Sequence, residues 1–186
     1  MASSTSDPLS LVAQISDRNL PPVHKWNPEL CGDIDIRIAR DGTWFYMGSP
    51  IGRKRLVNLF STVLRKDADG EHYLVTPVEK LRINVEDAPF VIVQVEEKGS
   101  GKEQVLYFRT KNDDVVLADH DHPIWVEVAN DGEPSPYIEV RDGLRGLIAR
   151  NVYYQLVELG EERQFGGNRE FGVWSSGEFF LLGAVS

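Results

Sequence analysis

Residues 34–48, IDIRIARDGTWFYMG, decide the fold that we expect for this chain. Three isoleucines (Ile34, Ile36, Ile38) occupy every second position, with charged residues between them. This period of two is typical of a strand that buries one face. Asp41-Gly42 favours a tight hairpin turn, after which the aromatic run supplies the returning strand. The stretch therefore predicts a β-hairpin.

A helix is expected directly after this hairpin, within residues 49–67, SPIGRKRLVNLFSTVLRKD. Ser49 is a suitable N-cap residue, and Pro50 suits the first helical position because its φ is already fixed. Apolar residues then recur at spacings of three and four, which indicates one buried helix face. These residues are Leu56, Leu59, Phe60, Val63 and Leu64.

The same pattern recurs later in the chain. Residues 124–140, IWVEVANDGEPSPYIEV, alternate again and place Asp131-Gly132 at a turn, 90 residues after Asp41-Gly42. Residues 141–160, RDGLRGLIARNVYYQLVELG, predict a second helix that ends at Gly160. Its apolar stripe comprises Leu144, Leu147, Ile148, Val152, Leu156 and Leu159. Strand signals follow both helices, HYLVT in the first half and EFFLLG in the second.

The expected fold class is therefore α+β, with two repeated β-hairpin–helix–strand units around a β-rich middle segment. In that middle, residues 90–96 and 104–109 should pair as antiparallel strands across the turn EKGSGKE. We expect residues 1–30 to form a helix and a Pro-rich arm, residues 31–118 the first unit with a β-rich insert, and residues 119–186 the second unit. Chance similarity of two unrelated segments is the alternative to duplication.

Composition narrows the class of protein. The 186 residues carry a net charge of −9, which disfavours nucleic-acid binding through a basic surface. The N-terminal segment, with a short helix expected from Asp7 and Pro8, lacks the features of a secretion signal, and no apolar run is long enough to span a membrane. A single cysteine, Cys31, fits a reducing compartment. We expect a soluble, cytoplasmic protein that binds neither nucleic acid nor membrane.

Four segments together resemble the bacterial family known as domain of unknown function 1285. They are GDIDIRIARDGTWFYMGSPIGRKRLVNLFSTVL, YLVTPVEKLRINVEDAPF, PYIEVRDGLRGLIARNVYYQLVE and GVWSSGEFFLLG. The resemblance covers residues 30–183. It implies an α+β protein built from repeated motifs and linked to signalling, and it carries over no catalytic residue.

Basic residues lie near both expected helix starts, where the helix dipole disfavours cations. They are Arg53, Lys54 and Arg55 in the first half, and Arg141 and Arg145 in the second. Together with backbone amides, such side chains would attract a phosphate, a carboxylate or an acidic protein. The alternative is that they pair with nearby carboxylates or only face water.

Residues 118–123, ADHDHP, raise the question of a metal site. In an extended segment His120 and His122 share one face, while Asp119 and Asp121 point to the other. Two histidines are too few for a zinc site, which needs three or four ligands. A polar turn before the next strand is the alternative interpretation.

The functional hypothesis is a non-enzymatic interaction or ligand-sensing protein, in a homodimer, with no cofactor. Its partner would be an acidic or phosphorylated small molecule, or an acidic protein. The alternative is a small metal-dependent hydrolase that uses His120 and His122. Known catalytic signatures are missing: GSPIGRK is not a P-loop, and Ser175-Ser176 does not lie in a nucleophile elbow.

Overall fold

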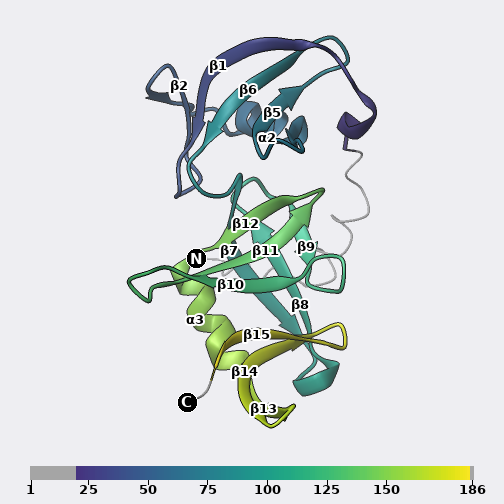
Figure 1. Ribbon diagram of the computed structural model, residues 1–186, viewed down its shortest axis with the longest axis vertical. Helices are drawn as coiled ribbons and strands as arrows, with labels where there is room; N and C mark the ends of the chain where they lie inside the picture. Colours follow the sequence, from purple (N-terminus) through teal and green to yellow (C-terminus); the bar gives the residue numbers. More distant parts are fainter. Residues whose placement is uncertain (1–19, 185–186) are drawn as a thin grey trace, which may run out of the picture.

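The protein consists mainly of β-sheet, divided between two units that follow one another along its long axis (Figure 1). The computed structural model describes residues 20–184. Within them lie two six-stranded sheets, one three-stranded sheet and two α-helices. The expected α+β class is therefore wrong, because the described residues are mostly strand and contain only two α-helices.

The N-terminal unit is one sheet with the strand order β3-β2-β1-β6-β5-β4. Strands β1 and β6 run parallel at its centre, and the other neighbours are antiparallel. Its elements are η1 (Val23–Lys25), β1 (Leu30–Ile38), β2 (Trp44–Tyr46), β3 (Ser49–Pro50), α2 (Lys54–Thr62), β4 (Leu64–Lys66), β5 (His72–Val75) and β6 (Lys80–Val85).

The first predicted hairpin is confirmed, since β1 and β2 pair antiparallel across the Asp41-Gly42 turn. The helix is shorter than predicted, because Ser49 and Pro50 add a short edge strand and Arg53 takes the N-cap position of α2. Phe60 of α2 stacks on the buried ring of Trp44, with ring centroids 6.3 Å apart. This contact fixes the helix against the hairpin.

The C-terminal unit contains a six-stranded sheet with the order β10-β11-β12-β7-β8-β9, helix α3 and a three-stranded sheet, β13-β14-β15. Edge strands β10 and β15 lie next to one another, so the two sheets curl into an incomplete barrel. Its elements are β7 (Phe90–Lys98), η2 (Gly101–Glu103), β8 (Val105–Thr110), β9 (Val115–Leu117), β10 (Ile124–Val128), β11 (Pro134–Arg141), β12 (Leu144–Ile148), α3 (Arg150–Leu159), β13 (Glu161–Phe165), β14 (Asn168–Ser175) and β15 (Glu178–Ala184).

Two strand predictions for this unit are confirmed. Strands β10 and β11 form the second hairpin, and β7 pairs antiparallel with β8 across the glycine-containing turn. The β-rich middle is not an insert, however, because β7 pairs in parallel with β12 at the centre of the C-terminal sheet.

The predicted helix start near Arg141 is wrong. Asp142 and Gly143 both have positive φ and form a tight turn, after which β12 returns beside β11. Gly146 packs so closely that an added Cβ would lie 3.0 Å from the Ile92 side chain. The helix begins only at Arg150 and ends, as predicted, at Gly160.

The expected repeat is also wrong. In the N-terminal unit, the strands on both sides of α2 belong to one sheet. In the C-terminal unit, the strands after α3 form a sheet of their own. The helix predicted from Asp7 lies outside the described residues.

One apolar core runs through both units. It includes Ile38 and Trp44 from the N-terminal sheet, Phe90 and Ile148 from the C-terminal sheet, and Leu156 from α3. Because this core contains residues of both units, the units are packed together rather than joined only by a linker.

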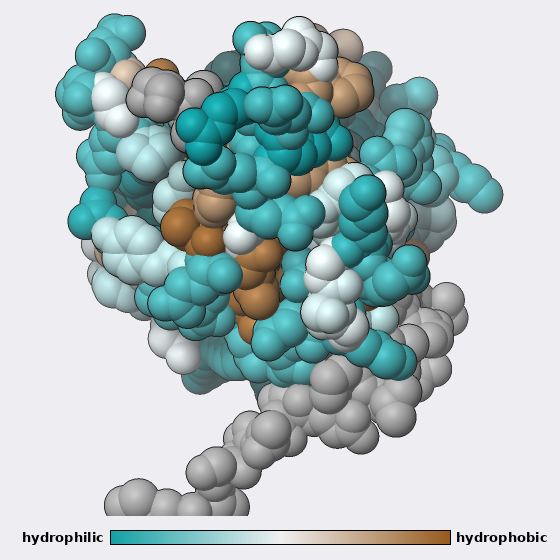
Figure 2. Space-filling model, turned by 90° about the horizontal axis from the view of Figure 1, so that it is seen from below, coloured by the Kyte–Doolittle hydropathy of each residue, from teal (hydrophilic) through white to brown (hydrophobic). Residues whose placement is uncertain are grey.

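Seen from the end formed by β13–β15, the surface is mainly hydrophilic, with a narrow hydrophobic strip across it (Figure 2).

Candidate functional site: a charged cleft between the two units

The largest hollow described lies where the N-terminal sheet meets the β11–β12 turn of the C-terminal unit. Its volume is about 500 Å³, which falls within the range of small-molecule sites. Both units contribute to its wall, so a bound molecule would touch both. The lining residues are Asp33, Ile34, Lys66, Gly70, Glu71, His72, Arg82, Ile83, Asn84, Val85, Asp87, Gly143 and Arg145.

Strand pairing places Lys66 and His72 side by side. They lie directly opposite one another in β4 and β5, and His72 in turn lies opposite Ile83 in β6. Directly paired residues of antiparallel strands project to the same face. The hairpin therefore carries an ammonium group and an imidazole to the cleft next to the buried Ile83 side chain.

The His72 imidazole is held in its neutral form. Burial, and then the positive charges of Lys66 and Arg145, lower the pKa of His72 from 6.5 to about 4. Among the described residues, no side chain hydrogen-bonds to this ring. At neutral pH His72 therefore offers one donor and one acceptor nitrogen to the cleft.

The arginines of the cleft already have carboxylate partners. Arg82 makes a two-point contact with Asp33, at 2.8 and 3.0 Å. This contact lowers the pKa of the Asp33 carboxyl below its usual value. Lys66 differs, because none of the described carboxylates forms an ion pair with it. Its ammonium group is thus available to a ligand.

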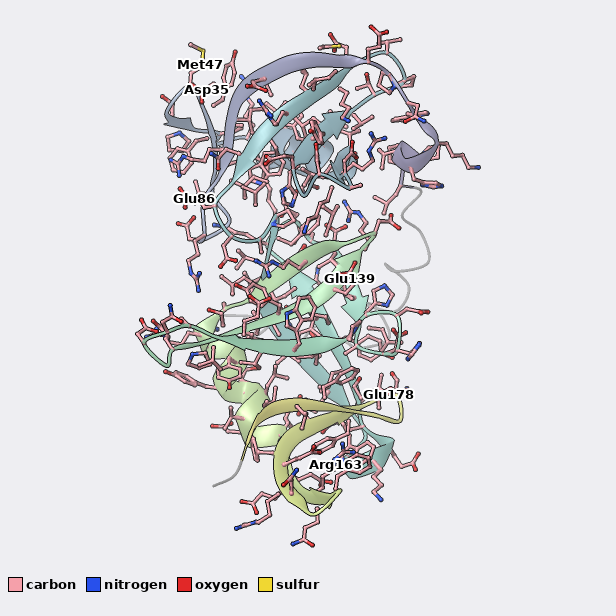
Figure 3. The ribbon with its side chains drawn as sticks, viewed as in Figure 1. Asp35, Met47, Glu86, Glu139, Arg163 and Glu178 are labelled. Atoms are coloured by element: carbon pink, nitrogen blue, oxygen red, sulfur yellow. The ribbon has the colours of Figure 1, made fainter. Side chains whose placement is uncertain are left out.

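Arg145 enters the cleft from the C-terminal unit. Its guanidinium lies over the ring of Tyr137, 4.2 Å from the centroid, and contacts Glu127 at 2.9 Å and Asp87 at 3.2 Å. The preceding turn is fixed because Glu139 accepts a hydrogen bond from the backbone N–H of Gly143 at 2.6 Å. Figure 3 shows Glu139 beneath this turn and Glu86 at the junction of the two units.

Two of the five predicted basic residues connect the units. Arg141 donates to the carbonyl of Ser61, near the end of α2, at 2.6 Å, and lies over the ring of Phe90. Lys54, the first residue of α2, forms an ion pair of 2.7 Å with Asp113 in the β8–β9 turn. Arg53 and Arg55 are exposed and lie outside the cleft. Only Arg145 of the predicted set lines it.

The predicted histidine pair lies elsewhere, in a turn before β10. Residues 119–122 are not extended, and Asp119 reaches back to accept from the backbone N–H groups of Asp121 and His122. Its carboxylate also lies 3.0 Å from Nδ1 of His122. Over residues 20–184, no group of three or more His, Cys, Asp or Glu side chains is arranged to hold a metal ion.

Lys66 and His72 were not predicted as site residues, although the sequence contains a signal for them. Asp69-Gly70 is a third hairpin turn signal, and it lies midway between these two residues. Pairing the flanking strands across that turn would have brought Lys66 and His72 together. The approach of Arg145 had no comparable signal, because it depends on how the two units pack.

The fold and the cleft define a class: a β-sheet protein of two packed units with a charged hollow between them. Two family models match the chain, the DUF1285 N-terminal domain over residues 21–88 and the DUF1285 C-terminal domain over residues 89–182. The chain belongs to the DUF1285 family, whose function is unknown. The two models meet where the N-terminal sheet ends and the C-terminal sheet begins.

Two solved structures of this family are similar to the chain. A DUF1285 family protein from Silicibacter pomeroyi DSS-3 is 49% identical, with a TM-score of 0.84, over 94% of this chain and 95% of that one. A DUF1285 family protein from Shewanella baltica OS155 is 31% identical, with a TM-score of 0.54, over 67% of this chain and 91% of that one. No curated protein matches the chain. Among the described residues, no helix is long and apolar enough to cross a membrane.

Proposed function

We propose that this protein is a non-enzymatic sensing or interaction protein that binds a small anion, of the phosphate monoester class, in the cleft between its units. The observation that carries this proposal is the meeting of unpaired Lys66 and the open His72 ring with Arg145 from the other unit. Charge-assisted hydrogen bonds from such groups are the usual means of holding phosphate.

The geometry supports binding better than catalysis. The described lining of the cleft contains no Ser, Thr or Cys nucleophile. Its cationic and neutral polar groups are the Lys66 ammonium, the His72 imidazole, the Asn84 amide and two guanidinium groups, and the guanidinium groups already contact carboxylates. The ammonium and the imidazole are therefore the groups that a ligand would engage first. Since the hollow is shared, an occupant would stabilise one placement of the units relative to one another, which is the property that a sensor needs. Within residues 20–184, no cluster of potential metal ligands supports the alternative of a metal-dependent hydrolase.

Calorimetry with the purified full chain tests this proposal. Phosphorylated metabolites are first screened by thermal shift, with inorganic phosphate as the simplest probe, and hits are then titrated. We expect Lys66→Ala to weaken binding by about tenfold, the loss of roughly one charged hydrogen bond. Lys98→Ala is the matched control, since Lys98 is an exposed lysine at the end of β7, outside the cleft.

A second readout locates the ligand. An anion beside His72 stabilises the imidazolium, so binding should raise the pKa of His72, which NMR titration of the ring measures directly. The proposal is wrong if hits bind equally well to wild type and Lys66→Ala, or if they leave the His72 titration unchanged.

A further inference from the structure

A second hollow, apolar in character, lies on the N-terminal unit between α2 and the β1–β2 hairpin. Its volume is about 460 Å³. We call it the α2 groove. Its wall combines the isoleucines of β1, the segment that follows β2 and one face of α2. The lining residues are Ile34, Ile36, Tyr46, Ser49, Pro50, Ile51, Gly52, Arg53, Leu56 and Phe60.

Arg53 is the one charged residue in this described lining. Most described arginines of this acidic protein contact a carboxylate, as Arg37, Arg65 and Arg163 do. Neither Arg53 nor Arg55 has such a partner among the described residues. Arg53 is the N-cap residue directly before α2, and it lines the groove together with Leu56 from the first turn of the helix. Arg55 does not line the groove.

The apolar surface continues from the groove to Met47. Tyr46, in the groove wall, is 49% exposed, and the neighbouring Met47 is 68% exposed. Met47 has a positive φ of 49°, and its N–H donates to the carbonyl of Asp35 at 3.0 Å. Figure 3 shows Met47 and Asp35 together at the outer end of the hairpin. A concave apolar channel with one unpaired guanidinium beside it matches a molecule with one apolar chain and one anionic head.

We propose that the α2 groove binds a single-chain fatty carboxylate, with its chain along Ile34, Ile36 and Leu56 and its carboxylate on Arg53. The groove lies between one helix and one hairpin and is concave, which suits a single alkyl chain better than the flat surface of a protein partner. The arginine supplies the charge complement that an apolar groove alone would lack. This ligand goes beyond the phosphate-type anion proposed for the cleft and occupies a different site.

The test is titration of the purified chain with dodecanoate below its micelle concentration, followed by calorimetry. We expect saturable binding with a stoichiometry of one. Arg53→Ser should weaken it by about tenfold through loss of the charged contact. Arg55→Ser is the matched control and should bind as wild type. Dodecanol, which has the chain without the charge, should bind to wild type and to Arg53→Ser equally weakly.

A blocking variant tests the location of the chain. Gly52 lines the groove, its φ is not in the left-handed region, and a Cβ added there meets nothing within 4 Å. Gly52→Phe should therefore be tolerated, as thermal melting would verify, and a ring on this wall should obstruct the groove and weaken dodecanoate binding. Lys66→Ala should leave dodecanoate binding unchanged, which separates this test from that of the cleft.

Three results would overturn the proposal. The first is absence of dodecanoate binding to wild type. The second is equal weakening by Arg53→Ser and Arg55→Ser. The third is a dimer in light scattering that Gly52→Phe dissociates, since a second copy of the chain would then cover the groove.

Discussion

The carboxylate of Asp87 lies 2.7 Å from the hydroxyl of Tyr137. Asp87 belongs to the connection between β6 and β7, whereas Tyr137 lies in β11 of the C-terminal sheet. The same carboxylate contacts Arg145 at 3.2 Å and Arg40, from the β1–β2 turn, at 2.5 Å. One side chain in the connection thus joins the hairpin of the first unit to the sheet of the second.

Replacing Asp87 should therefore destabilise the junction. Its side chain is only 9% exposed, so Asp87→Ala leaves the Tyr137 hydroxyl without its acceptor in a poorly solvated place and leaves Arg145 with Glu127 as its one carboxylate partner among the described residues. We expect a loss of about 2 kcal/mol in the free energy of unfolding, measured by urea titration. Glu133→Ala, which breaks an exposed ion pair with Arg150, is the control and should cost less than about 0.5 kcal/mol. Equal losses in both variants would contradict the assigned role.

Arg141 should be equally sensitive to substitution. The Arg141 side chain is only 15% exposed. Its guanidinium donates a hydrogen bond to the Ser61 carbonyl and lies 3.6 Å from the Asp114 carboxylate. We expect Arg141→Met to lower the free energy of unfolding by about 2–3 kcal/mol, because a carbonyl and a carboxylate lose their donor while apolar bulk is kept. Arg141→Lys should recover only part of this, since an ammonium lacks the planar fork that spans two acceptors. A wild-type melting curve for Arg141→Met would rule out the interunit contact.

These contacts also explain how much of the fold the sequence could predict. The Asp-Gly hairpins depend on local turn chemistry, and the two that were predicted, at Asp41-Gly42 and Asp131-Gly132, are present. The spacing of Leu144, Leu147 and Ile148 fits a helix face and a buried strand equally well. What decides between them is the parallel pairing of β12 with β7, as in Gly146 opposite Phe90. That contact is remote in sequence and leaves no local pattern.

In the candidate site, too, local features could be predicted from the sequence, whereas contacts between the units could not. Arg145 was identified from its charge, but for a helix start that does not exist. Its actual setting, over Tyr137 and beside Asp87, comes from packing between the units. Lys66 and His72 are neighbours through a local turn, so the sequence could have paired them. It could not have indicated that a second unit would face them across a cleft.

The free energy of unfolding should depend on pH through the lowered pKa of His72. Its pKa is about 4 in the folded protein and near 6.5 when unfolded, so between these values the unfolded state binds the extra proton. This contribution to stability is complete above pH 6.5 and is lost as the pH falls towards 4. After allowance for partial exposure, we expect wild type to lose about 1 kcal/mol more than His72→Gln between pH 7 and pH 5.

The comparison between variants isolates this effect. Carboxylates whose pKa is lowered, such as Asp67 through its hydrogen bond from Arg65, lose their contribution at lower pH and do so in both proteins. His120→Gln, at an exposed histidine outside the cleft, should keep the wild-type dependence. Urea unfolding at three pH values gives the slope of the free energy of unfolding against pH for each variant. Parallel slopes for wild type and His72→Gln would show that the ring is not held neutral.

Among the glycines of the three-stranded sheet, Gly172 should be the one at which an added side chain destabilises the protein most. It is buried in β14, and a Cβ added there would lie 2.3 Å from the carbonyl oxygen of Phe180 and 2.6 Å from the ring of Phe179. The obstacle is partly backbone of the paired strand, which cannot move aside without breaking the register of β14 and β15. We expect Gly172→Ala to lower the free energy of unfolding by about 2 kcal/mol or more.

Gly183→Ala provides the matched control for that substitution. Gly183 lies in the adjacent strand β15, its φ is not in the left-handed region, and an added Cβ meets nothing within 4 Å. Alanine there should change stability by less than about 0.5 kcal/mol or raise it slightly, because alanine restricts the unfolded chain more than glycine does. Thermal melts of the two variants, side by side, measure the difference. If both melt like wild type, β14 and β15 are not packed at Gly172 as described, and the close approach of the two strands there is wrong.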